Sequence, residues 1–157
     1  MYVEVIYLKK SLIAKIIWII LIIILVIGTG CLIFLPSLYD IFKDVGVPKF
    51  NEHTMYYRIA FFACYIICLF IVYKLIGLFK HVFSDTPFKK EVEAILKTCA
   101  ILFMSLFVIV SIKCVFIPTI LSFAVSFVCF VASLSFYCLA EVIKAAIYYK
   151  QEVDYTV

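Results

Sequence analysis

Charged residues are scarce in this chain: 15% of its 157 residues are Asp, Glu, Lys or Arg, whereas 68% are hydrophobic. A soluble domain carries about 25% charged residues, and a small globule leaves too much surface exposed to hide so many apolar side chains. The mean hydropathy of +1.23 agrees with this composition. The scarcity of charge therefore excludes a soluble domain and predicts an integral membrane protein.

Histidine and glycine are also rare, with two and four copies. Neither histidine, His53 or His81, belongs to an HExxH pattern or to a Ser/His/Asp order, and the glycines form no phosphate-binding loop. These absences give no support to enzymatic chemistry. We expect a protein that is not an enzyme, that holds no metal or cofactor, and that does not bind nucleic acid directly.

The seven cysteines all lie within apolar runs or at their edges. An odd number of cysteines inside apolar helices does not describe a disulfide framework. Cys64 and Cys68 are four residues apart and share a helix face, a spacing that suits a metal. Zinc needs about four ligands, however, and no histidine or carboxylate lies at a matching depth. We therefore interpret the cysteines as small packing residues.

Four apolar runs are each long enough to cross a bilayer as a helix, which takes about 20 residues. They are residues 12–35, 59–79, 99–117 and 119–140. Only Pro118 separates the last two runs, which predicts a tight hairpin. The fold class expected is all-α: a polytopic membrane protein with four transmembrane helices in a single domain, residues 1–157.

The basic residues are divided unequally between the two sides of these spans. Four of them, Lys43, Lys49, Arg58 and Lys113, fall on the side of the first loop. The other ten fall on the side of both termini and the middle segment: Lys9, Lys10, Lys15, Lys74, Lys80, Lys89, Lys90, Lys97, Lys144 and Lys150. Because basic residues concentrate on the cytoplasmic side, we expect both termini in the cytoplasm and the chain in the cell membrane.

The last span carries one ordered feature, a stripe of small, weakly polar residues spaced four, three and four apart. In lipid, helices associate through small residues and interhelical hydrogen bonds. We interpret this stripe as the seam by which the span packs into the bundle, and leave a ligand groove on the same face as the alternative. Gly28 and Gly30 are expected to allow similar close contact in the first span. The stripe consists of Ser122, Ser126, Cys129 and Ser133.

The segment between the second and third spans predicts an amphipathic cytoplasmic helix at residues 86–98. Ser84, Asp85 and Thr86 offer N-cap oxygens, and Pro87 suits the first turn. The helix has one apolar stripe, which must be covered by headgroups, by the inner end of the second span, by the C-terminal tail or by a partner. The simplest expectation is that this helix packs against the tail. The stripe consists of Phe88, Val92, Ile95 and Leu96.

The same two segments carry a family resemblance. "FSDTPFKKEVEAILKT" (residues 83–98) and "LAEVIKAAIYYKQEVDYTV" (residues 139–157) resemble the inner segment and the C-terminus of a bacterial family of uncharacterised four-span membrane proteins, a domain of unknown function. Members are often encoded beside a small Cro/CI-like helix-turn-helix regulator. The resemblance implies that the cytoplasmic face binds such a regulator.

The leading hypothesis is therefore a regulatory membrane protein that docks a small cytosolic DNA-binding partner. One alternative is an immunity or resistance protein that intercepts a membrane-active peptide, using the outer loop of residues 36–57 or the seam of the last span. Another is an oligomeric channel or carrier, which would require a homo-oligomer. The residues expected to contact the partner are Phe88, Glu91, Val92, Glu93, Glu141, Glu152 and Asp154.

Overall fold

The computed structural model describes residues 2–34, 36–37, 54–83, 90–116 and 120–155. Within these residues it contains four long α-helices. The expected interfacial helix of the outer loop, at residues 38–45, lies outside the described residues. The four helices are α1 (Tyr2–Cys31), α3 (Thr54–Phe83), α4 (Lys90–Phe116) and α5 (Ile120–Tyr155).

Three of these helices are long and apolar enough to cross a bilayer: Arg58–His81 in α3, Lys90–Phe116 in α4 and Ile120–Glu152 in α5. The segment Lys15–Cys31 of α1 is a shorter apolar helix. In a bilayer the backbone must satisfy its own hydrogen bonds, which a helix does within a single segment. The chain is therefore a small multi-pass membrane protein built from helices.

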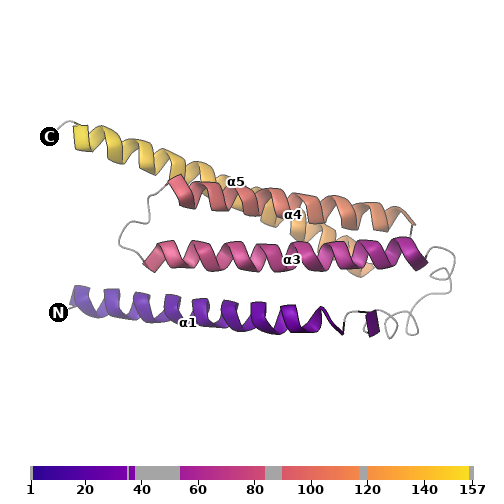
Figure 1. The fold of residues 1–157 in the computed structure, drawn as a ribbon. Helices are drawn as coiled ribbons and strands as arrows, with labels where there is room; N and C mark the ends of the chain where they lie inside the picture. The colour runs from indigo at the N-terminus through magenta and orange to yellow at the C-terminus, as the bar shows by residue number, and fades with distance from the viewer. Residues whose placement is uncertain (1, 35, 38–53, 84–89, 117–119, 156–157) are drawn as a thin grey trace.

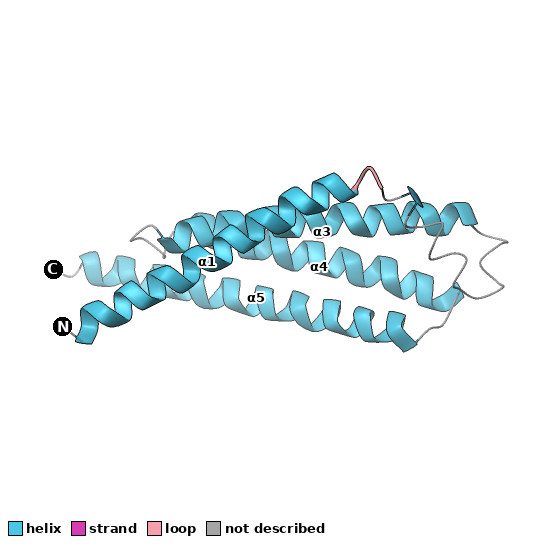
Figure 2. Cartoon of the chain, turned by 90° about the horizontal axis from the view of Figure 1, so that it is seen from below, coloured by secondary structure: helices cyan, strands magenta, loops and turns pink. Residues whose placement is uncertain are grey.

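The helices lie side by side along one long direction, with both termini at the same end (Figure 1). We call this the terminal end; it also holds the end of α3 and the start of α4. The opposite, far end holds the end of α1, the start of α3, the end of α4 and the start of α5. The packing follows chain order, with α1 against α3, α3 against α4 and α4 against α5 (Figure 2).

A small apolar core joins α3, α4 and α5 near the middle of the bundle. Ile71, Leu106 and Cys129, one from each helix, are buried together. Two aromatic pairs extend this core between α4 and α5. Phe103 stacks on Phe136 with a centroid distance of 5.3 Å, and Phe107 meets Phe130 at 5.2 Å.

Helix α1 is fixed to α3 by a close contact at Gly28. The Tyr65 hydroxyl donates a 2.7 Å hydrogen bond to the Gly28 carbonyl, and a Cβ built at Gly28 would lie 2.7 Å from Leu69 Cδ2. A larger residue at this position would require the Leu69 side chain to move, so Gly28 allows the close approach, as expected. The expectation for Gly30 is wrong, because a Cβ at that position would meet nothing within 4 Å.

The helices extend beyond the apolar runs from which they were expected. Helix α1 begins at Tyr2 and α5 continues to Tyr155. The polar sequences at the start of α1 and at the end of α5 contain no glycine or proline that would end a helix. At the other end of α1, the helix stops at Cys31 and residues 32–34 form a turn. The apolar run alone placed that boundary too late.

Candidate functional site

The polar stripe of α5 is a sealed seam against α4. All four of its residues are buried, with exposed fractions of 4–8%. Ser126 and Ser111 share a 2.8 Å hydrogen bond between their hydroxyls, and Ser133 donates a 2.8 Å bond to the Ala100 carbonyl. The Lys113 ammonium donates a 3.4 Å hydrogen bond to the Ser122 hydroxyl. Because α4 covers the stripe, it presents no open groove on that face.

At the terminal end, the apolar stripe of the α4 extension is covered by the chain itself. Val92 and Leu96 are each 3% exposed and form a cluster with Ala140 of α5, which is fully buried. Leu78 at the end of α3 and Ile143 of α5 pack against the same cluster. The expected packing of the two extensions is therefore present, and the end of α3 contributes to it.

A row of alternating charges ties α4 to α5 beside this cluster. Lys97 Nζ lies 2.8 Å from Glu93 Oε1 on its own helix and 3.3 Å from Glu141 Oε1 on α5. Glu141 also lies 3.7 Å from Lys144. Single exposed ion pairs stabilise little, but a network with fixed geometry restricts the two segments more than one pair would. The row thus fixes where the α5 extension leaves α4.

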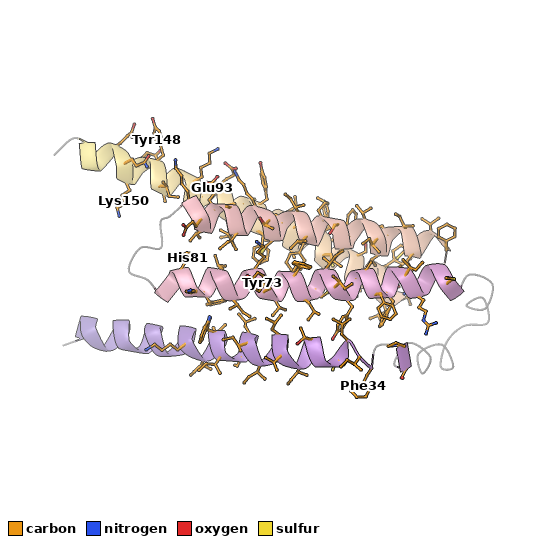
Figure 3. All side chains as sticks on the ribbon, in the orientation of Figure 1. Phe34, Tyr73, His81, Glu93, Tyr148 and Lys150 are labelled. Carbon is orange, nitrogen blue, oxygen red and sulfur yellow. The ribbon has the colours of Figure 1, made fainter. Side chains whose placement is uncertain are left out.

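A second pair joins α3 to the first turn of α4. His81 Nε2 lies 3.5 Å from Glu91 Oε2, with the Glu91 side chain 65% exposed. Both Glu91 and Glu93 stand in the first turn of α4, where the helix dipole favours negative charge. Figure 3 shows His81, Glu93, Tyr148 and Lys150 gathered at this end, with Phe34 at the far end.

The residues expected to contact a partner fall into four groups. Val92 is a core residue, so its side chain offers no surface to a partner. Glu93 and Glu141 belong to the charge row. Glu91, which pairs with His81, and Glu152 are both exposed to solvent. Phe88 and the side chain of Asp154 lie outside the described residues.

The α5 extension carries an exposed ridge that the sequence reasoning missed. Its residues are spaced three, four and three apart, which places them on one helix face, opposite the buried Ala140 and Ile147. Val142 is 64% and Tyr149 67% exposed, and the other two members are also exposed. The spacing was available in the sequence, but only the burial of the opposite face shows which stripe is free. This docking ridge consists of Val142, Ala145, Tyr149 and Glu152.

A groove runs beside the ridge, between the first turns of α4 and the α5 extension. Its volume is about 530 Å³. Ile147 forms a buried part of its wall, and the exposed rings of Tyr148 and Tyr149, 6.5 Å apart and edge to face, stand on its α5 side. The complete lining is Lys90, Glu93, Glu141, Lys144, Ala145, Ile147, Tyr148, Tyr149 and Gln151.

No group of three or more His, Cys, Asp or Glu side chains among the described residues is placed to hold a metal ion. All seven cysteines are free thiols, and three of them, Cys99, Cys114 and Cys129, are buried. This burial agrees with a packing role for these three.

Comparison with known proteins adds no relative: no protein-family model, no curated protein and no solved structure matches this chain. The resemblance to the four-span bacterial family therefore rests on the two terminal-end segments and on the order and placement of the apolar runs. The structure supports the general fold that this resemblance implies, a small membrane protein with several apolar helices.

Proposed function

We propose that this chain is a non-enzymatic, regulatory membrane protein that docks a small cytosolic protein on the docking ridge of α5. The observation that carries the proposal is the length of α5, which has 36 residues. At 1.5 Å per residue it is about 54 Å long, whereas the hydrocarbon core of a bilayer is about 30 Å thick. A large part of α5 thus serves no need of membrane crossing.

The surface of this projecting part has the character of a protein interface. A helix with one buried and one exposed face binds partners through residues spaced three and four apart, as in the docking ridge. Tyr149 stands near the centre of the ridge and is 67% exposed. Tyrosine is enriched among the residues that dominate binding energy at interfaces, so Tyr149 is the anchor we propose.

The charges favour a basic partner. Glu152 lies at the outer end of the ridge, and Glu91 is exposed on α4. Complementary charge steers association and selects partners, and a DNA-binding protein is basic on the surface that meets DNA. Together with the family resemblance, this supports a small helix-turn-helix regulator, held at the cytoplasmic face and kept from DNA while it is bound.

The proposal is tested by comparing membrane-bound proteins in three strains by quantitative mass spectrometry. One strain carries the wild-type chain, one carries Tyr149→Ala with Glu152→Lys, and a control carries Lys150→Ala. Lys150 belongs to the same extension but projects to a different side from Tyr148 (Figure 3). We expect a small DNA-binding protein on the membranes of the wild-type and control strains, and its loss from the membranes of the ridge variant.

An unchanged set of membrane-bound DNA-binding proteins in the ridge variant would refute the docking proposal. The chain's own level in each strain is measured in the same experiment, so that loss of the partner is not confused with loss of the chain. Protection against a membrane-active peptide, if it persisted in the ridge variant, would instead favour the immunity alternative.

A further inference from the structure

Two lysines and two glutamates line the groove beside the ridge. The lysines are Lys90 and Lys144, and both glutamates lie within 3.3 Å of Lys97, which stands outside the groove lining. Lys144 pairs with Glu141 only at 3.7 Å, the longest contact of the row. Lys90 forms no ion pair with any residue that the structure describes. The ammonium groups of Lys90 and Lys144 are therefore available to an anion.

From the groove toward the middle of the bundle, the same faces of α4 and α5 carry exposed apolar side chains. On α5 a spacing of four, three, four and three leads from Tyr148 through Lys144 and Glu141 to Tyr137 and Leu134, which are 53% and 48% exposed. On α4 the corresponding track leads from Lys90 through Lys97 to Ile101, which is 69% exposed. The groove, with its two lysines, thus opens directly onto two apolar tracks.

The groove also lies at the depth of lipid headgroups. Among the described side chains, the last exposed large aliphatic residue of α5 is Val142. Along the helix axis Lys144 stands about 3 Å and Tyr148 about 9 Å farther out. The headgroup layer on each side of a bilayer is about 5–7 Å thick. Tyrosine is enriched at this interface, and basic pockets between membrane helices bind anionic headgroups.

We infer that the groove is a binding site for an anionic phospholipid. The phosphodiester lies between the ammonium groups of Lys90 and Lys144, with the Tyr148 hydroxyl and the Gln151 amide as further donors. The acyl chains follow the apolar tracks past Tyr137 and Ile101. The site shares Ala145 and Tyr149 with the docking ridge, but the two lysines that hold the phosphodiester, Lys90 and Lys144, lie outside the ridge.

The test measures lipid binding to the purified full chain by native mass spectrometry. The probes are phosphatidylglycerol and the zwitterionic phosphatidylcholine, each titrated in detergent. A basic residue near a membrane surface contributes about fivefold to the binding of anionic lipid. We therefore expect Lys90→Gln with Lys144→Gln to weaken phosphatidylglycerol binding about 25-fold and to leave phosphatidylcholine binding unchanged.

The matched control is Lys80→Gln with Lys150→Gln, which removes the same charge from the same end but outside the groove, and should retain phosphatidylglycerol binding. A second variant, Ala145→Trp, fills the groove without changing its charge and should also weaken binding, whereas Val142→Trp on the neighbouring face should not. Glycerol 3-phosphate, a soluble anion, should not displace the lipid.

Three results would overturn the inference: wild-type phosphatidylglycerol binding by the Lys90/Lys144 variant, an equal loss in the Lys80/Lys150 control, or displacement by glycerol 3-phosphate at the concentrations at which the lipid binds. The last would assign the groove to a soluble phosphate. No partner protein is present in the assay, so failure here leaves the docking proposal untouched, and failure of docking leaves this site untouched.

Discussion

Lys97 of α4 and Glu141 of α5 are joined across the two helices, with the lysine ammonium 3.3 Å from the carboxylate. The same ammonium holds Glu93 at 2.8 Å, so one side chain connects the start of α4 to the point where α5 leaves the apolar span. This contact sets the position of the extension that carries both the docking ridge and the groove.

Removing this contact should loosen the α5 extension without unfolding the bundle. We expect Lys97→Met to increase amide hydrogen exchange in residues 141–152, because the charge row no longer ties α5 to α4, while exchange in residues 122–133 stays slow. Lys80→Met is the matched control, since Lys80 lies at the same end of the bundle and outside the row. Unchanged exchange in the extension would show that apolar packing alone holds it.

The close approach of α1 to α3 should depend on Gly28. A larger residue there meets Leu69, and overpacking of a well-packed contact costs about 1–3 kcal/mol. We expect Gly28→Val to lower the free energy of unfolding in mixed micelles by about that amount. Gly30→Val should have little effect, because the space at Gly30 is open. Equal losses in both variants would contradict the contact.

The seam between α4 and α5 should distinguish two serines on the same helix. Ser133 is 4% exposed and bonds to Ala100 of α4, whereas Ser135 is exposed and bonds to Val131 of its own helix. Ser133→Leu should lower the free energy of unfolding by about 1–3 kcal/mol through overpacking. Ser135→Leu should leave the free energy of unfolding nearly unchanged in lipid. A larger decrease for Ser135→Leu than for Ser133→Leu would mean that Ser135, and not Ser133, faces α4.

The orientation can be read from thiol labelling with a membrane-impermeant reagent. In a Cys31→Ser background, we expect Met55→Cys, at the far end, to be labelled in intact cells. Lys150→Cys, at the terminal end, should be labelled only after the membrane is opened. Labelling of Lys150→Cys in intact cells would place the terminal end outside and would remove the basis for a cytosolic partner.

Much of the fold follows from the sequence because a bilayer imposes few choices. Apolar runs of about 20 residues must be helices, and the spacing of Ser122, Ser126, Cys129 and Ser133 placed them on one face before any contact was known. The close contact at Gly28 was expected for the same reason. These features depend on local periodicity, which a single sequence contains.

The features that could not be predicted from the sequence are those that depend on which helices pack against each other. Val92 was expected on a docking surface because an apolar stripe in a polar segment needs a cover, and the structure supplies that cover with Leu78 and Ala140. The bridge from Lys97 to Glu141 joins segments far apart in the chain, so no local spacing indicates it. Likewise, the ridge around Tyr149 is defined only by the burial of the opposite face.

Photo-crosslinking at Tyr149 in intact cells tests the central claim most directly, with a matched probe at Met55 at the far end of the bundle. We expect the Tyr149 probe to capture a small DNA-binding protein and the Met55 probe not to capture it. Adducts only within the chain or to lipid at Tyr149 would contradict the central claim, as would capture of the same protein from both positions.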